Sequence, residues 1–219
     1  MTQEYSAAIA ALVSRANAVR ARVVESEVTR RTILDAAEAL LAAGGEERLS
    51  IRELCTRAGV TPPTIYHHFG DKQALVDRVI DECFAEFDAA LARRPPPADP
   101  VDGLAWAFDR YVDYGVAHPT HYRLMFQRTS ARKSAVGLGA YDRLRRMVRA
   151  VADAGRLTTP TEVATRACWS TAHGVTSLVV GGFFGRDDPA VVLVRDGLLA
   201  RITQPAPARR ARSERRLRA

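Results

Sequence analysis

Hydrophobic residues recur along this chain at helical spacing, three or four positions apart, with polar residues between them. Two such stripes stand out, over residues 33–41 and 75–91. The first ends at Gly44-Gly45, and the second ends before the proline-rich stretch 95–100. Because no short alternating runs are separated by turn residues, the pattern predicts an all-α fold without a sheet.

Further helices are predicted on both sides of these stripes. Residues 5–28 have helical spacing and form either an added helix or a partly disordered arm. Beyond the proline-rich stretch, breaks that include three X-Pro steps separate five helices, at 101–117, 120–130, 139–154, 161–180 and 189–203.

Residues 50–62 carry the signals of two short helices joined by a tight turn. Ser50 and Glu53 form a capping box, in which the serine hydroxyl accepts from the Glu53 amide and Glu53 reaches back. Gly59 suits the positive-φ position where the first helix ends. Thr61 offers an N-cap hydroxyl, and Pro62 fits the first turn of the second helix. Helix, glycine turn, helix is the arrangement that places a second helix in the DNA major groove.

The pieces of this motif, taken one by one, have a second interpretation. A capped helix followed by a glycine turn occurs in many helical proteins that do not bind DNA. On this interpretation Tyr66 and Phe69 are core aromatics, and the adjacent His67 and His68 are solvated surface residues. The two interpretations differ in what the outer face of the second helix contacts.

The motif as a whole resembles the DNA-binding domain of the TetR family of regulators. The resemblance rests on L-S-I-R-E-L at 49–54, A-G-V at 58–60, T-P-P-T-I-Y-H-H-F at 61–69 and D-K-Q-A-L at 71–75. It extends over residues 29–75. It implies an all-helical homodimer that binds a palindromic double-stranded DNA operator, usually as a repressor that a small-molecule effector releases.

The resemblance also implies roles for residues around the second helix. Thr64 and His67 would meet base edges or the nearby backbone, and Tyr66 and Lys72 would contact phosphates. The amides at the starts of both helices would point at phosphate oxygens. Because prolines cannot donate hydrogen bonds, the start of the second helix would read DNA by apolar contact, for example with thymine methyl groups. The candidate DNA-binding residues are Ser50, Arg52, Thr61, Pro62, Pro63, Thr64, Tyr66, His67 and Lys72.

The distal half carries two further resemblances to the same family. Residues 118–126 resemble the segment that begins a helix facing the effector cavity, and 169–174 resemble the tryptophan–histidine–glycine signature of one C-terminal subgroup. Aromatic walls with a few polar groups suit a small-molecule pocket, although the same side chains would also fill a closed core. Since the aromatics have few acidic neighbours, we expect a neutral or weakly polar ligand of aromatic or acyl type. The candidate ligand-binding residues are Trp106, Tyr111, Tyr122, Phe126, Trp169 and His173.

The resemblance places the homodimer interface on the last two predicted helices, 161–180 and 189–203. The residues expected to supply the interface are Val175, Leu178, Val179, Leu198, Leu199 and Ile202.

The net charge of +7 is concentrated at the two ends of the chain. After Gln204 there are six arginines and one glutamate, and residues 1–31 hold five arginines and three glutamates, so the span 32–203 is neutral. Bulk charge is therefore a weak argument for DNA binding, which depends on the motif. The basic ends support an alternative function, a non-specific nucleic-acid-coating protein. A footprint on one palindromic site would favour the regulator, and uniform coverage would favour coating.

Other functional classes lack support in the sequence. There is no nucleophile elbow, phosphate loop or paired His/Cys spacing, so we expect no enzyme, no cofactor and no metal site. Three scattered cysteines outside any CxxC indicate no disulfide framework. No run approaches about 20 apolar residues and no signal peptide is recognisable, so we expect a cytoplasmic protein without a membrane partner.

Together these signals divide the chain into four parts. They are an N-terminal extension at 1–28, a helix-turn-helix domain at 29–75, a helical effector-binding and dimerisation domain at 76–204, and an Arg-rich tail at 205–219. The expected fold class is all-α, with a three-helix DNA-binding domain followed by a larger helical domain. The expected function is sequence-specific transcription regulation by a repressor that leaves DNA when its effector binds.

Overall fold

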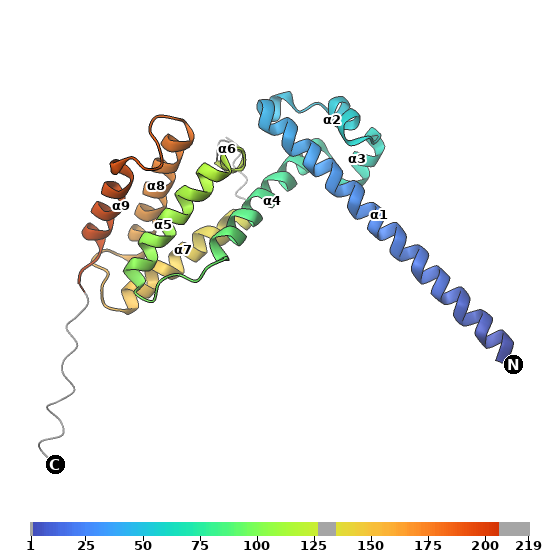
Figure 1. Ribbon diagram of the computed structural model, residues 1–219, viewed down its shortest axis with the longest axis horizontal. Helices are drawn as coiled ribbons and strands as arrows, with labels where there is room; N and C mark the ends of the chain where they lie inside the picture. The colour runs from blue at the N-terminus through green and yellow to red at the C-terminus, as the bar shows by residue number, and fades with distance from the viewer. Residues whose placement is uncertain (1, 127–134, 206–219) are drawn as a thin grey trace, which may run out of the picture. The chain divides into compact units, whose positions relative to one another are not determined.

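The computed structural model describes residues 2–126 and 135–205, with the side chains of 14–126 and 139–205. Over these residues the chain is helical (Figure 1), and the predicted all-α fold is confirmed. Apart from one isolated bridge between Leu157 and Thr203, no strand forms in this part of the chain. None of the described helices is long and apolar enough to cross a membrane. The helices are α1 (Thr2–Arg48), α2 (Ile51–Ala58), α3 (Pro62–Phe69), α4 (Lys72–Ala92), α5 (Pro100–Ala117), α6 (Pro119–Phe126), α7 (Ala135–Asp153), α8 (Thr161–Val180) and α9 (Pro189–Ile202).

Two compact units divide the chain, unit 1 (Met1–Ile80) and unit 2 (Asp81–Ala219). Unit 1 holds α1, α2, α3 and the start of α4, and unit 2 holds the rest of α4 and α5 to α9. The helix-turn-helix and the candidate ligand residues therefore lie in different units. The end of the helix predicted at 120–130 and all of the Arg-rich tail except Pro205 lie outside the described residues.

The first helix, α1, is longer than the helix predicted ahead of the helix-turn-helix. It begins at Thr2 and continues through the segment 5–28 to Gly45, whose φ of 70° and ψ of −174° are not helical. No proline or glycine precedes Gly44, so nothing in the sequence stops the helix earlier. The segment 5–28 is therefore an N-terminal continuation of α1 rather than a separate helix, and its residues 14–28 are exposed.

The core of unit 1 is built from one face of each of its helices. Here α1 packs against α2, and α2 packs against α3. Because α2 and α3 have eight residues each, one fully buried side chain in each, Leu54 and Ile65, determines which side of the helix faces out. The buried apolar residues of this core are Ile33, Leu34, Ala37, Leu40, Leu41, Leu49, Leu54, Ile65, Leu75, Val76, Val79 and Ile80.

Unit 2 is a helical bundle in which α5 packs against α7, α8 and α9, and α8 packs against α7 and α9 (Figure 1). Its central cluster consists of Leu104, Val148, Val151, Ala164, Cys168, Leu199 and Ile202. The Asp99 and Asp188 side chains cap α5 and α9, each accepting at 2.8 Å from an amide just beyond the proline that opens the helix. These caps explain why α5 and α9 start where the X-Pro steps predict, whereas α7, which has no such signal, begins at Ala135 rather than at residue 139.

Candidate DNA-binding face and ligand pocket

The turn between α2 and α3 depends on a glycine. Gly59 ends α2 in the left-handed region, with φ 65° and ψ 31°, and its N–H donates to the Cys55 carbonyl. A residue with a Cβ would be strained at that φ. At the start of α2 the Ser50 hydroxyl accepts from the Glu53 amide at 3.5 Å, as predicted. The predicted reciprocal hydrogen bond, from the Ser50 amide to the Glu53 side chain, is wrong. The Glu53 carboxylate accepts instead from Arg57, one turn further on, at 3.4 Å.

The start of α3 also differs from the sequence prediction. Thr61 occupies the N-cap position with an extended backbone, but its hydroxyl makes no capping bond. The physical reason is the proline pair: Pro63 has no N–H to offer, and the Thr64 amide donates to the Thr61 carbonyl at 3.0 Å. The Thr61 hydroxyl lies 3.0 Å from the Thr64 hydroxyl instead. This contact ties together two of the residues proposed to meet DNA.

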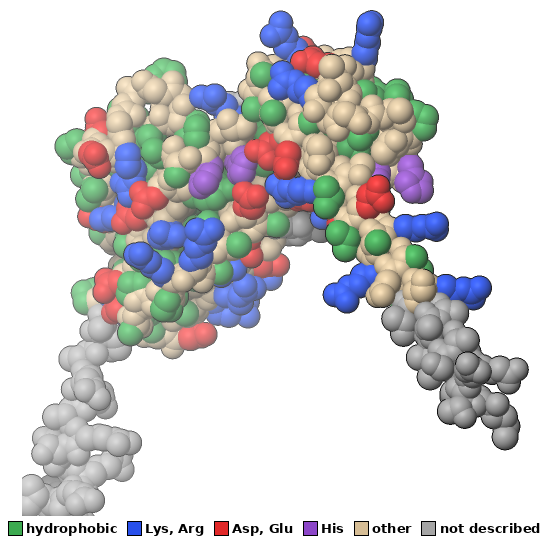
Figure 2. All heavy atoms as spheres, turned by 45° about the vertical axis from the view of Figure 1, so that its right-hand side comes forward, with side chains coloured by type: hydrophobic (Ala, Val, Ile, Leu, Met, Phe, Trp, Pro, Cys, Tyr) green, Lys and Arg blue, Asp and Glu red, His purple; other side chains and the backbone are tan. Residues whose placement is uncertain are grey.

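Positive charge is not gathered over the helix-turn-helix. On the face shown in Figure 2, Lys and Arg side chains are interspersed with Asp and Glu. Arg52 and Arg57 are the only basic Lys or Arg residues in α2 and α3, and Arg57 is paired with Glu53. Contacts to DNA from these helices would therefore depend on helix amides, hydroxyl groups and rings more than on a strong positive field.

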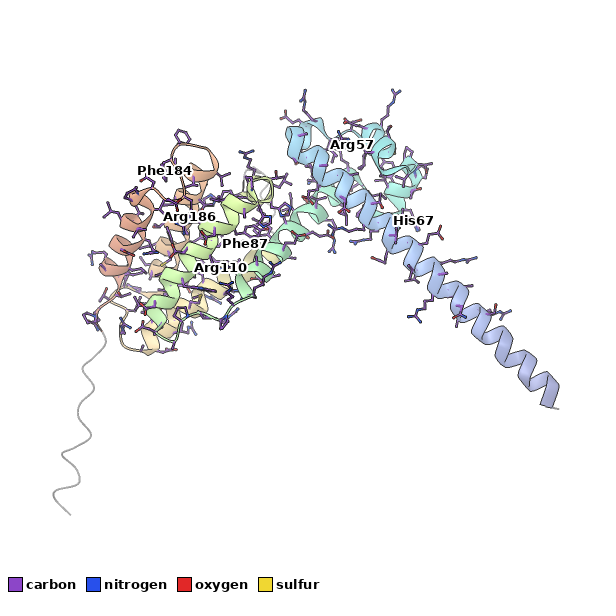
Figure 3. All side chains as sticks on the ribbon, in the orientation of Figure 1. Arg57, His67, Phe87, Arg110, Phe184 and Arg186 are labelled. Carbon is purple, nitrogen blue, oxygen red and sulfur yellow. The ribbon has the colours of Figure 1, made fainter. Side chains whose placement is uncertain are left out.

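The third helix, α3, turns Ile65 into the core and leaves its other side accessible to solvent. Ile65 is fully buried, whereas Tyr66 is 47% exposed and His67 projects outward (Figure 3). Phe69 is half-buried, with the Arg30 guanidinium 5.6 Å from its ring centre. All nine candidate DNA-binding residues keep solvent access: Thr64 and Lys72 are half-buried, and Ser50, Arg52, Thr61, Pro62, Pro63, Tyr66 and His67 are exposed.

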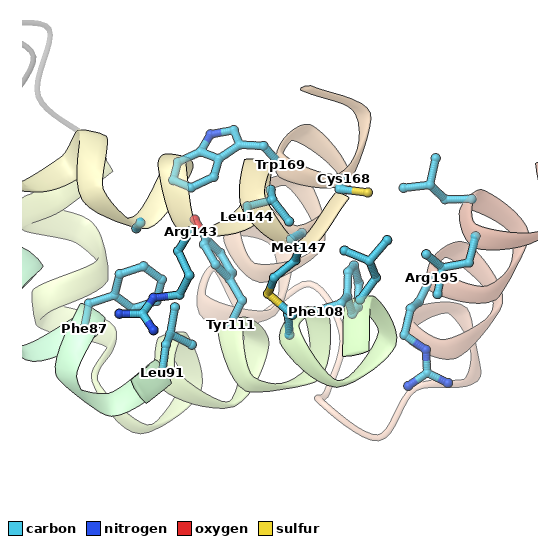
Figure 4. Close-up of a pocket in the computed structure, with 16 residues that line it drawn as sticks. Phe87, Leu91, Phe108, Tyr111, Arg143, Leu144, Met147, Cys168, Trp169 and Arg195 are labelled. Carbon is cyan, nitrogen blue, oxygen red and sulfur yellow. The ribbon is translucent and has the colours of Figure 1, made fainter. Parts of the chain in front are cut away.

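Unit 2 contains a cavity of about 60 Å³, partly open to solvent, among α4, α5, α7, α8 and α9 (Figure 4). Its walls are mostly apolar and contain two charged residues, Arg143 and Arg195. Two of the predicted ligand-binding residues, Tyr111 and Trp169, line it, and the other four, Trp106, Tyr122, Phe126 and His173, do not. The lining residues are Phe87, Leu91, Leu104, Ala107, Phe108, Tyr111, Ala140, Arg143, Leu144, Met147, Cys168, Trp169, Ala172, Arg195, Leu198 and Leu199.

Three of the remaining predicted ligand residues form a cluster beside Tyr111. The Tyr122 hydroxyl lies 2.8 Å from Nδ1 of His173, 3.0 Å from the His173 carbonyl oxygen and 3.1 Å from the Ser177 hydroxyl. Phe126 packs on the His173 ring at 4.8 Å between centres. Burial lowers the pKa of His173 and raises the pKa of Tyr122, so both side chains are neutral at pH 7. The cluster's polar groups thus contact one another in the folded chain.

The arginines of the cavity are the residues that the sequence analysis missed. Arg143 lies one turn before Met147, and Arg195 lies one turn before Leu199, so each precedes an apolar residue of the same helix face. That spacing is the available signal, because a long side chain at such a position can lay its stem along the apolar surface. Trp106, in contrast, lies apart from the cavity, with the Arg110 guanidinium 6.0 Å from its ring centre.

Part of the apolar surface expected at the dimer interface is used inside unit 2. Val175, Leu199 and Ile202 are buried and hold α8 and α9 in the core, while Val179 and Leu198 are half-buried. The sequence could not separate the two sides of these helices because both are apolar. The exposed large apolar residues of α8 and α9 are Val163, Leu178, Val192, Leu193 and Val194.

We expect unit 2 to lose stability as the pH falls from about 7.5 to about 5.0, in part through His173. Burial holds the pKa of His173 below its ordinary value, so below that value the unfolded chain binds the proton more readily than the folded chain. The stability that His173 contributes is therefore fully present above its pKa in the unfolded chain, and it declines as the pH drops below that value. Urea unfolding of wild type and His173→Gln at both pH values measures the effect, with an exposed-histidine variant, His118→Gln, as control. Identical pH dependence in wild type and His173→Gln would contradict the assignment.

Comparison with known families matches both units. Residues 33–79 match the family described as bacterial regulatory proteins, tetR family, and residues 104–200 match the tetracyclin repressor-like C-terminal domain. The two ranges together cover more than half of the chain. The helical fold and the α2–turn–α3 unit place the chain in the helix-turn-helix class. The chain belongs to the tetR family of bacterial regulatory proteins.

Individual relatives match over part of their length. The chain is 33% identical over 92 residues to the HTH-type transcriptional regulator UidR of Escherichia coli K12, covering 42% of this chain and 41% of UidR. It is 36% identical over 86 residues to the regulator TtgR of Pseudomonas putida, covering 39% and 40% of the two chains. The matched stretch thus spans about two fifths of these curated relatives.

Solved structures match over more of the chain. A protein of unknown function from Rhodococcus sp. RHA1 has a TM-score of 0.68 and 27% identity, covering 80% of this chain and 96% of that one. FadR of Bacillus subtilis, solved in complex with stearoyl-CoA, has a TM-score of 0.61 and 14% identity, covering 78% and 96%. The FadR likeness concerns the fold alone.

Proposed function

We propose that this protein is a sequence-specific transcriptional repressor that binds a palindromic operator as a homodimer in the cytoplasm. The observation that carries the proposal is the α2–turn–α3 unit. Leu54 and Ile65 fix the two helices on the core, while seven of the nine candidate DNA-binding residues are exposed. A helix held in this way can enter the major groove with Tyr66 and His67 outward. The relatives UidR and TtgR, which are named as transcriptional regulators, support it.

We assign one part of this function to each of the domains predicted from the sequence. Residues 29–75 would bind DNA and residues 76–204 would bind an effector and form the dimer, with 1–28 and 205–219 as appended segments. The dimer would use the exposed apolar residues of α8 and α9, because a two-fold contact there would remove them from water. The tryptophan–histidine–glycine resemblance of Trp169, His173 and Gly174 suggests the C-terminal subgroup.

A small-molecule effector is the second part of the proposal. It would bind at the cavity of unit 2, whose mostly apolar walls suit a partly apolar ligand. The structure of FadR holds stearoyl-CoA in a similar fold, which supports a ligand with an apolar portion here. To release DNA, the effector must bind one geometry of the dimer more tightly than another, since equal affinity for both would shift nothing.

His67→Ala and Tyr66→Phe are each expected to weaken operator binding by about 1–3 kcal/mol, the usual cost of a lost base or phosphate contact. The measurement is a footprint and a binding titration on DNA from upstream of the protein's own gene and its neighbours, at fixed salt. His118→Ala removes an exposed histidine of unit 2 and is the matched control, which should bind as wild type does. If both α3 variants keep wild-type affinity, α3 is not the recognition helix.

The same footprint tests the alternative, a protein that coats nucleic acid through its basic ends. A repressor protects one palindromic site and leaves flanking DNA open to cleavage. A coating protein protects all sequences evenly, because phosphate neutralisation carries no sequence information. Even protection that His67→Ala leaves unchanged would favour coating.

A further inference from the structure

The two arginines of the cavity differ in the number of carboxylates to which they donate hydrogen bonds. Arg195 donates to Asp109 and Asp196, and Arg186 also donates to Asp109 and to Asp113. Three carboxylates therefore surround two guanidinium groups at this end of the cavity. An incoming anion would meet an excess of negative charge there. Arg195 is consequently a poor anchor for a ligand carboxylate.

At the other end, Arg143 donates to a single carboxylate among the residues that the structure describes. Its Nε donates to one oxygen of Asp88 at 3.1 Å, and its Nη2 donates to the other at 3.0 Å. This is the paired geometry in which guanidinium groups bind carboxylates most strongly. The two side chains are 32% and 35% exposed, so the pair stands at the edge of the cavity in contact with solvent.

The helix that supplies Asp88 also supplies one wall of the cavity. Phe87 and Leu91 of α4 line it on either side of Asp88 in the sequence, and Arg143 comes from α7 (Figure 4). The ion pair therefore joins the α4 wall to α7. The volume of the cavity, about 60 Å³, is far below the roughly 300 Å³ at which ligand pockets begin. A ligand of ten or more carbon atoms therefore needs the walls to move apart, and the α4 wall is held to α7 by this ion pair.

We propose that the Arg143–Asp88 pair is a carboxylate-exchange latch, and that the effector is an amphipathic monocarboxylate. The ligand's carboxylate takes the place of Asp88 on Arg143, and its apolar body lies between the α4 wall and residues such as Phe108 and Met147. This proposal rests on the effector-binding role proposed above and names the chemical class of the effector, an anion with an apolar body in place of the neutral or weakly polar ligand expected from the sequence.

The exchange is energetically feasible because it keeps the number of charge-assisted hydrogen bonds on Arg143 unchanged. One carboxylate replaces another on the same guanidinium, and Asp88, already one-third exposed, is released to water. The apolar body then supplies the net gain, at about 25 cal/mol per Å² of surface removed from water. An alcohol of the same shape would gain the apolar term but could not replace the Asp88 carboxylate.

The test compares acids with their matched alcohols by titration calorimetry on the full chain without DNA. The probes are decanoate with decan-1-ol, and 4-phenylbutyrate with 4-phenylbutan-1-ol. Wild type should bind the acids about tenfold or more tightly than the alcohols, as expected for hydrogen bonds to a charged group. Arg143→Met should lower acid affinity about tenfold or more, and it should raise alcohol affinity because an alcohol then has no ion pair to break. Asp88→Asn, which removes the internal competitor, should raise acid affinity about tenfold.

Arg145→Met is the matched control, because Arg145 is on the same helix and pairs with Asp142 at 3.2 Å outside the cavity. It should bind every probe as wild type does. Arg143→Lys keeps the charge and should retain the preference for acids if Arg143→Met melts early. Equal affinity for acids and alcohols in wild type, or no acid binding to Asp88→Asn, overturns the latch. Operator binding of the same proteins without a probe tests the proposed function separately.

Discussion

Tyr122→Ala is expected to lower the free energy of unfolding of unit 2 by about 3–5 kcal/mol, the usual cost of truncating a buried aromatic side chain. Tyr122 is 4% exposed, and its ring packs against Phe126 at 4.9 Å and His173 at 5.7 Å between centres. It does not line the cavity of unit 2. Removing it should therefore leave a void in the core rather than a larger ligand site.

A second variant separates the ring from its hydroxyl group. Tyr122→Phe keeps the ring but leaves the Ser177 hydroxyl and Nδ1 of His173 without their contact to Tyr122, so we expect a loss of about 1–3 kcal/mol. Urea unfolding followed by tryptophan fluorescence measures both variants, since Trp106 and Trp169 are the chain's two tryptophans and both are in unit 2. A wild-type unfolding midpoint for Tyr122→Ala together with altered ligand-induced release of DNA would instead make Tyr122 a ligand contact.

Local signals explain which parts of the fold the sequence could predict. The bounds of α5 and α9 were accessible because each begins with an aspartate cap and a proline, a signal contained within three residues. The α2–turn–α3 unit was accessible for the same reason, through Ser50 and Gly59. The continuation of α1 to Thr2 was left open because helical spacing on an exposed segment gives no core against which to confirm it.

The cavity depends on packing between helices, which local sequence patterns do not predict. Six aromatic and histidine residues fitted a pocket equally well by composition, yet only Tyr111 and Trp169 line it. The Arg143–Asp88 pair joins residues 55 positions apart, and the place of Arg143 one turn before Met147 does not reveal its partner. The proline pair at the start of α3 correctly predicted the helix. The missing hydrogen bond from the Thr61 N-cap was not predicted, because it depends on which backbone amide is free to donate.

Phe87→Ala is expected to destabilise unit 2 by about 3–5 kcal/mol as well, for a different structural reason. Phe87 is 1% exposed and meets Tyr111 and Tyr114 edge-on, at 5.2 and 5.0 Å between ring centres. These contacts attach the unit 2 part of α4 to α5, and such aromatic pairs contribute about 0.5–1.5 kcal/mol beyond the area they bury. Since Phe87 also lines the cavity, the space left by its ring would join the existing one.

Because Phe87 lies both in the core and in the cavity wall, Phe87→Ala has a consequence that Tyr122→Ala lacks. The enlarged apolar space should admit a small apolar molecule such as benzene, as dry engineered cavities do, and saturating benzene should restore part of the lost stability. Tyr122→Ala should show no comparable rescue, because its void is separate from the cavity and lined by polar groups of His173 and Ser177. Val116→Ala, which trims an apolar residue of α5 that is 42% exposed, is the control and should change stability by less than about 0.5 kcal/mol. Wild-type stability of Phe87→Ala would mean that α4 is not anchored to unit 2 through this ring.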